Sequence, residues 1–206
     1  MPSPRERMVI SAALLIRERG AQPTAIADVL EHSGAPRGSA YHYFPGGRTQ
    51  LLCEAIDYAG QFVAAKIARA SRSLDALDVL VGSYRDQLIR SDHRAGCPVV
   101  AVAVEAGDPD NQDRTAPVME RAAAVFARWT DLIAQQLAAE GVTESRAEEL
   151  AMLVTTSIEG AIVVARASRD VKPLDLVHRQ LRALLQAETS AETRDETTER
   201  KRRRDR

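Results

Sequence analysis

Three consecutive residues, Ser91, Asp92 and His93, have the side-chain types of a hydrolytic triad. Consecutive side chains do not face one another, because a working triad is assembled in space from separate segments of a chain. The sequence also has neither a G-x-S-x-G turn around a serine nor a Gly-rich phosphate loop. We therefore expect no catalytic residues and no enzyme.

The two cysteines, Cys53 and Cys97, are isolated and have no C-x-x-C spacing, so we expect no metal site and no cofactor. Two separate thiols suit the reducing cytoplasm better than a disulfide scaffold. Cys97 could be a redox-sensing thiol, but no basic residue nearer than Arg94 would lower the pKa of its thiol. Burial before Pro98 is the better interpretation.

The segment GAPRGSAYHYF offers a different chemistry, the recognition of DNA. An arginine can reach a phosphate or a guanine edge, a Gly-Ser pair leaves room for close approach, and a tyrosine and a histidine present polar tips. The formal net charge is −1, so charge alone does not identify a DNA-binding domain here. The candidate DNA-facing residues of this segment are Arg37, Gly38, Ser39, Tyr41 and His42.

Three short helices are expected to hold this segment. The spacing of apolar residues predicts a first helix over residues 5–19, which a glycine ends. Thr24 is a suitable N-cap for a second helix through His32, and Pro36 suits the first turn of a third one, which ends at Tyr43. A second helix, a glycine turn and a third helix in this order form a helix-turn-helix signature.

The rest of the chain also follows a helical period. Hydrophobic residues make up 45% of its 206 residues, which is enough for a buried core. The run at 99–105 could be a strand by propensity, but no other segment supplies a partner strand, so we expect a buried helix. Neither a signal region nor an apolar run of membrane-spanning length is expected. The other predicted helices are at about 48–70, 73–91, 116–139, 144–168 and 173–188.

These elements predict an all-α fold with two domains. Residues 1–48 would form the helix-turn-helix domain, and residues 49–188 a larger helical domain. Residues 189–206 are acidic and then basic, and we expect them to be a disordered charged tail that could add non-specific DNA affinity or simply be solvated.

Residues 7–56 resemble the DNA-binding domain of the TetR family of bacterial transcriptional regulators. The stretches PGGRTQLLCEA and GCPVVAVAVE are similar to the LmrA/YxaF-like branch of that family. The resemblance implies a dimeric regulator, most simply a repressor that a small molecule releases from operator DNA. It also implies that Thr24 and Arg48 contact phosphates, that Phe44 is core, and that Arg37, Ser39, Tyr41 and His42 face DNA.

The sequence departs from the family pattern at Leu30, Ala35 and Pro36. Pro36 replaces a usual serine and so removes a hydroxyl. Ala35 is smaller than the usual valine, and Leu30 is larger than the usual alanine. These changes affect the expected base contacts and leave the domain itself unaffected.

In the family, the C-terminal helices form a ligand pocket and a dimer interface, here expected through the last two helices. Gly160 and Ala161 permit close helix packing, although the apolar residues around them could equally be core of one subunit. The indole N–H of Trp129 needs a partner if it is buried. Candidates to line a pocket for a largely apolar or aromatic effector, each also a candidate for plain core, are Phe62, Tyr84, Leu88, Cys97, Val100, Val104, Met119, Phe126, Trp129 and Met152.

Two interpretations stay open at this point. Glu105 could face a cationic ligand, but a solvated helix end is preferred because a loop sequence follows it. The chain could also be a helical small-molecule carrier with vestigial N-terminal helices, which binding to DNA would distinguish from a regulator. The sequence names neither the effector nor the operator, and it does not separate repression from activation.

Overall fold

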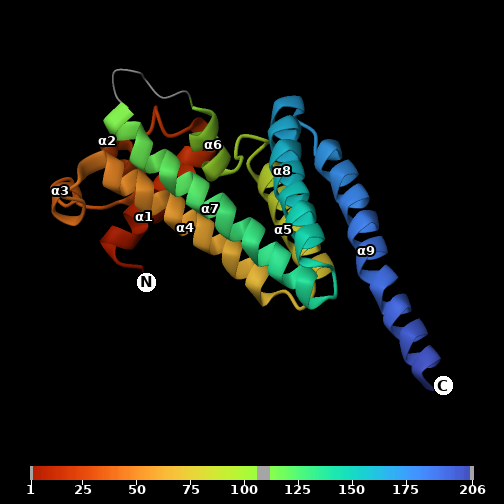
Figure 1. Cartoon of the computed structure of the whole chain (residues 1–206). Coiled ribbons are helices and arrows are strands. Elements are labelled where there is room, and N and C mark those ends of the chain that lie inside the picture. Colours follow the sequence, from red (N-terminus) through yellow and green to blue (C-terminus); the bar gives the residue numbers. More distant parts are fainter. Residues whose placement is uncertain (1, 106–111, 205–206) are drawn as a thin grey trace.

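The computed structural model describes residues 2–105 and 112–204, without the side chains of 112–115 and 191–204. Every regular element in these residues is a helix, which confirms the all-α prediction (Figure 1). The helices are α1 (Pro4–Arg19), α2 (Ile26–Ser33), α3 (Ala40–Tyr43), α4 (Gly47–Arg69), α5 (Ser73–Arg90), α6 (Pro98–Val104), α7 (Gln112–Ala139), α8 (Glu144–Ser168) and α9 (Lys172–Arg204).

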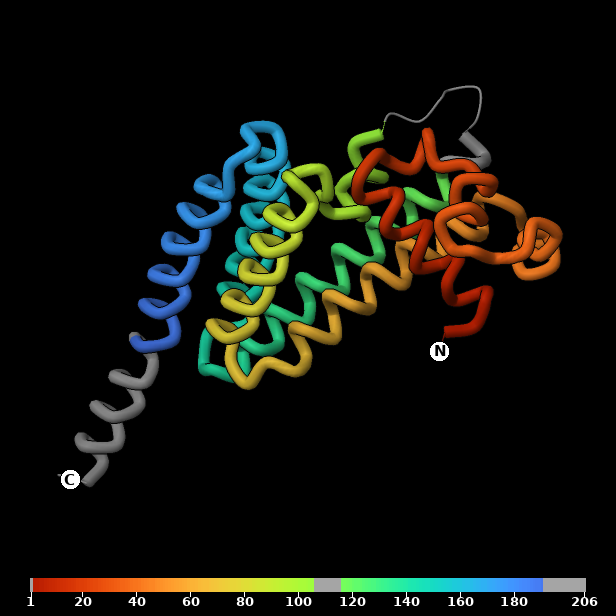
Figure 2. The backbone as a smooth tube through the Cα atoms, turned by 180° about the vertical axis from the view of Figure 1, so that it is seen from behind, coloured from red at the N-terminus to blue at the C-terminus, as the bar shows by residue number. Residues whose placement is uncertain are grey.

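The helices α1–α3 gather at one end of the molecule, and we call this part the head (Figure 1). Helices α4 and α7 run side by side away from the head, and α4 packs against α1 as well as α7. At the other end α5 stands beside α8 and α9, as the opposite view also shows (Figure 2). Helix α4 therefore joins the head to helices α5–α9, which we call the larger helical part.

The head has a well-defined start and a compact core. The hydroxyl of Ser3 accepts a hydrogen bond from the Glu6 amide, and the Glu6 carboxylate accepts one from the Ser3 amide, so a capping box begins α1. Met8, Ile16 and Phe44 are fully buried, and α1 packs against both α2 and α4. The predicted core position of Phe44 is thus confirmed.

Two details of the head differ from the prediction. The N-cap of α2 is Ala25, whose amide donates to the Asp28 carboxylate at 3.0 Å, so Thr24 as N-cap was wrong. Pro36 does not begin α3, because the amide and the hydroxyl of Ser39 both donate to its carbonyl, at 2.9 and 2.7 Å. These bonds close a tight turn, and only one helical turn follows from Ala40.

Helices α4 and α7 meet at Gly60 with almost no space between them. A Cβ atom on Gly60 would lie 2.6 Å from Cγ2 of Val125, and the Gly60 carbonyl accepts a hydrogen bond of 2.9 Å from the indole of Trp129. The indole N–H of the buried Trp129 therefore has the hydrogen-bond partner that burial requires. The close approach fixes the direction of α4 relative to the larger helical part.

Two expectations about the C-terminal helices need correction. Helix α8 is long and apolar enough to cross a membrane by length and composition, contrary to the prediction, but half of that window is buried inside the protein, which is typical of a core helix. Helix α9 does not stop near Glu188, because its bounds reach Arg204 and no Gly or Pro follows Pro173. The side chains of the basic tail lie outside the described residues.

Candidate functional site

The turn before α3 and α3 itself present an exposed polar surface at the tip of the head. Arg37, Gly38 and His42 are exposed, and Tyr41 is 72% exposed although its neighbour Ala40 is buried. Ser39 is half-buried, with its hydroxyl turned to Pro36. Since Ala40 and Phe44 anchor the helix to the core, the side chains between them project outward from a fixed base.

Thr24 and Arg48, for which the resemblance implies phosphate contacts, are engaged inside the head. Thr24 is 1% exposed, and its hydroxyl donates to the Gly20 carbonyl at 2.7 Å. The half-buried Arg48 guanidinium donates to the carbonyls of Thr24 at 2.9 Å, of Gln22 at 3.1 Å and of Ala21. Both side chains therefore hold the loop between α1 and α2 in this structure.

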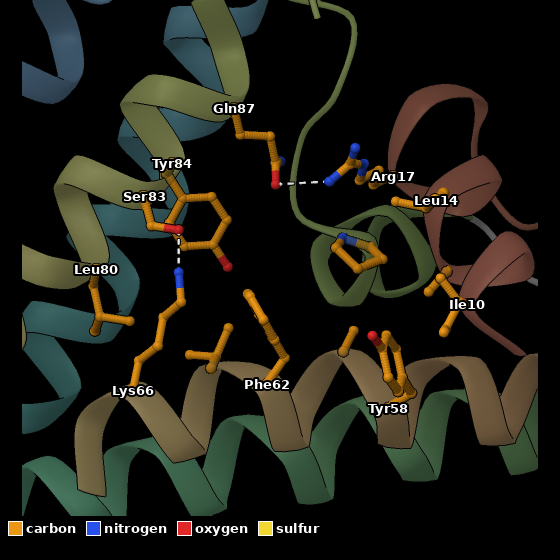
Figure 3. A pocket seen from close by; sticks show the side chains of 14 residues that line it. Ile10, Leu14, Arg17, Tyr58, Phe62, Lys66, Leu80, Ser83, Tyr84 and Gln87 are labelled. Carbon is orange, nitrogen blue, oxygen red and sulfur yellow. Dashed lines mark hydrogen bonds between the residues drawn. The ribbon is translucent and has the colours of Figure 1, made fainter. Parts of the chain in front are cut away.

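A partly open cavity of about 170 Å³ lies between the head and the larger helical part (Figure 3). Helices α1, α4 and α5 supply its walls, and Pro98 at the start of α6 completes them. Its lining is mostly apolar, with a few polar groups that point inward, as is usual for small-molecule sites. The lining residues are Ile10, Ala13, Leu14, Arg17, Tyr58, Ala59, Phe62, Val63, Lys66, Leu80, Ser83, Tyr84, Gln87 and Pro98.

Of the ten predicted pocket residues, Phe62 and Tyr84 line this cavity. The other eight do not line it. The prediction included them because a helical period identifies an apolar face without showing which part of that face borders an open space. Leu88, Cys97 and Trp129 are buried in the core, Val100 and Phe126 are half-buried, and Val104, Met119 and Met152 are exposed.

Two cations line the cavity that sequence reasoning missed. The Lys66 ammonium donates to the Ser83 hydroxyl and lies 4.6 Å from the centre of the Phe62 ring. The Arg17 guanidinium donates to the Gln87 side chain at 2.9 Å. Desolvation, followed by the charge of nearby Arg90, lowers the pKa of the Lys66 ammonium. The signal was the spacing of Phe62 and Lys66, which places both on one face of α4.

A buried polar cluster lies next to the cavity wall, where Tyr84, Cys97 and Glu159 interact. Glu159 of α8 is 9% exposed, and one of its carboxyl oxygens has no hydrogen-bond partner among the described residues. Burial raises the pKa of this carboxyl to about 7, and the hydrogen bond with the Cys97 thiol opposes that rise. Burial likewise raises the pKa of the Cys97 thiol, which confirms the buried interpretation of that residue.

The C-terminal end of α1 and the loop after it are hydrogen-bonded to α8 and to the segments on both sides of α6. The Gly96 amide donates to the Arg17 carbonyl at 2.8 Å, and Arg166 of α8 donates to the Glu18 carbonyl. Glu105 lies at the end of α6, as expected, but it is half-buried and its carboxylate accepts a hydrogen bond of 2.8 Å from the Gln22 amide, so it is not simply solvated. Backbone groups of the head are thus held directly by groups of the segment before α6, of the end of α6 and of α8.

The other chemistry considered from the sequence does not form a site. Asp92 directs its carboxylate to Arg169 at 2.7 Å and so makes no triad with its neighbours. Within the described residues, no group of three His, Cys, Asp or Glu side chains could hold a metal ion.

Comparison with known proteins agrees with this architecture. Residues 73–180 match the family described as transcriptional regulator LmrA/YxaF-like, C-terminal domain. An uncharacterised HTH-type transcriptional regulator of Mycobacterium tuberculosis is 65% identical over 94% of this chain and 100% of its own length. The HTH-type transcriptional regulator LmrA of Bacillus subtilis is 27% identical over 82% of this chain and 90% of its own.

Solved structures show the same fold. A TetR transcriptional regulator from Legionella pneumophila superposes with a TM-score of 0.74 at 18% identity, covering 88% of this chain and 96% of its own. The regulatory protein TetR from Rhodobacter sphaeroides superposes with a TM-score of 0.71 at 23% identity, covering 88% and 98% of the two chains.

Proposed function

Because this chain belongs to the TetR family of transcriptional regulators, in its LmrA/YxaF-like branch, we propose that it is a dimeric repressor that a small molecule releases from its operator. The effector, with a largely apolar or aromatic body, would bind in the cavity between the head and the larger helical part. The observation that carries this proposal is that a helix of the head forms one wall of that cavity. Such a protein acts in the cytoplasm, where the DNA is.

Helix α1 contributes Ile10, Ala13, Leu14 and Arg17 to the cavity. A ligand there would touch the head itself as well as α4 and α5, so its binding free energy could depend on where the head lies. A ligand shifts a conformational equilibrium only by the difference in its affinity for the two states. Contact with both moving parts is the simplest source of such a difference.

The contacts at the end of α1 would transmit that shift. Arg17 lines the cavity with its side chain, while its carbonyl accepts from Gly96 and the neighbouring Glu18 carbonyl accepts from Arg166. Displacing Arg17 would therefore disturb the bonds that set the angle of the head on α5 and α8. A changed separation of two heads would no longer match successive major grooves of the operator.

The dimer would form through an exposed apolar face of α8 and α9. A two-fold dimer doubles the phosphate contacts of a small head and fixes the spacing of its half-sites. These side chains are exposed in the single chain, which argues against their being core of one subunit, and Gly160 lies among them with open space around its Cα. The exposed residues are Met152, Leu153, Val163, Val164 and Leu176.

A gel-shift titration against the DNA that flanks the gene tests the proposal. Tyr41→Ala should abolish the shifted band, and Arg37→Ala should lower the slope of log affinity against log salt by about 1, as expected for one lost phosphate contact. Arg128→Ala removes a matched exposed arginine from α7, far from α3 in sequence, and should leave the slope unchanged.

The same titration separates the alternatives. No specific shift, together with tight binding of a small molecule, would favour the carrier over the regulator. A ligand that tightens operator binding would indicate an activator or a co-repressor mechanism instead of release.

A further inference from the structure

The cavity shows which class of effector it would take. We propose that the effector is a small organic anion, with a carboxylate or a similar group held between Lys66 and Arg17 and an apolar body lying against Phe62. This inference rests on the proposed function, because it names the ligand class of the same site.

Among the described residues, the charged side chains that line the cavity are all cationic. Lys66 and Arg17 both line it, and no Asp or Glu of the described residues does. Neither cation belongs to an ion pair with a described residue, although the described residues contain surface ion pairs such as Arg5 with Glu54. Two partly desolvated cations facing one apolar space are costly unless an anion joins them, since buried charge is stable only when it is paired.

The Arg17 guanidinium has hydrogen-bonding capacity left over. Its terminal nitrogen donates to Gln87, but its Nε is buried without any partner in the described part of the protein. An arginine fork presents parallel N–H groups that match the two oxygens of a carboxylate. This guanidinium is half-buried, and the resulting desolvation lowers its pKa.

Lys66 approaches the same space from the other side (Figure 3). Its ammonium has three donors, and the hydrogen bond to Ser83 uses one of them. Phe62, whose ring centre lies 4.6 Å from that ammonium, is 57% exposed and also lines the cavity. Tyr84 lies between the two cations, with its hydroxyl directed into the space that they flank (Figure 3).

The size of the cavity limits the body of the anion. Its volume of about 170 Å³ is close to that of an engineered protein cavity of about 150 Å³ that binds benzene. Ile10, Leu14, Val63 and Leu80 supply apolar walls. A one-ring or comparably sized acid therefore fits both the shape and the charge.

Calorimetric titration of the full-length protein with three matched probes tests the inference: phenylacetate, its neutral amide, and the phenethylammonium cation. We expect phenylacetate to bind about tenfold or more tightly than the amide, because hydrogen bonds between charged groups are stronger than those to a neutral amide. Lys66→Met should remove most of that preference while leaving the circular dichroism spectrum unchanged. Lys172→Met, at an exposed site on α9, should keep it.

Equal binding of acid and amide, tighter binding of the cation, or no binding of phenylacetate at millimolar concentration would each overturn the inference. Survival of the preference in both Lys66→Met and Arg17→Gln would overturn it as well. If Lys66→Met fails to fold, Lys66→Gln keeps a polar contact to Ser83 and carries the same expectation.

Failure of the inference and failure of the proposed function are distinguishable. Operator binding is measured without any probe, so a protein that binds DNA but is released by a neutral compound remains a repressor with a different effector class. A protein that prefers phenylacetate but binds no operator has the anion site and is not a repressor.

Discussion

The buried carboxyl of Glu159 should make the stability of the protein fall as pH rises. The folded protein holds this carboxyl at a pKa of about 7, against an ordinary value of 4.5. In the unfolded chain the group ionises above 4.5, whereas in the folded protein it resists ionisation until about 7. The free-energy cost of ionising this carboxyl inside the folded protein is therefore absent at pH values well below 4.5. It grows as the pH rises from 4.5 to about 7 and is complete above the folded pKa.

The magnitude follows from the gap between these two pKa values. At about 1.4 kcal/mol per pKa unit, the complete penalty is about 3 kcal/mol, most of which develops between about pH 5 and pH 8. Glu159→Gln has nearly the same shape and cannot ionise. Over that pH range we expect the free energy of unfolding of the wild-type protein to fall by about 2–3 kcal/mol more than that of this variant.

Urea unfolding at a fixed protomer concentration measures this difference, since dimer stability depends on concentration. Only the pH-dependent part of the difference matters, because the amide also changes the hydrogen bond to Cys97 at every pH. Glu148→Gln, on the exposed side of the same helix, is the matched control and should follow the wild-type curve. Parallel curves for wild type and Glu159→Gln would refute the argument that burial dominates this carboxyl.

Three further changes test the head, the helix packing and the dimer. Gly60→Ala should lower the free energy of unfolding by about 1–3 kcal/mol, because its Cβ would overlap Val125, whereas Gly82→Ala, with open space on α5, should raise it by up to about 1 kcal/mol in the same thermal melts. Arg48→Gln should weaken operator binding without changing the salt slope, because Arg48 holds loop carbonyls; a slope reduced by about 1 would instead establish the phosphate contact. Val164→Asp should convert dimer to monomer in sedimentation with unchanged helix content, and a persistent dimer would place the interface elsewhere.

The helices could be predicted because apolar periodicity and breaker residues are local properties. The predicted range 144–168 coincides with α8, and the prediction for residues 73–91 missed the end of α5 by a single residue. The errors lie where a hydrogen bond decides the outcome. Neither the turn that the Ser39 amide and hydroxyl close onto Pro36 nor the bond from Thr24 to Gly20 follows from residue type.

The candidate site could be predicted only in part, because its walls come from helices that are distant in sequence. The exposed residues around α3 were available from the motif, since each of them lies in one short segment. The cavity depends on the α1 face containing Arg17 meeting the α4 face containing Lys66, and a single cation on an amphipathic helix usually means a solvated edge. Only the fold shows that both cations border the same apolar space.

The position of Arg17 at this cavity also connects the ligand class to the proposed release from DNA. An anion that binds the unpartnered Nε of Arg17 would pull on the same guanidinium that donates to Gln87, and Gln87 in turn donates to the Gly96 carbonyl at 2.8 Å. Gly96 is the residue whose amide holds the Arg17 backbone, so the hydrogen bonds form a closed circuit between α1, α5 and the segment before α6. A neutral ligand of the same size could fill the cavity without drawing Arg17 from this circuit. Charge, more than volume, would then decide whether an occupied cavity moves the head.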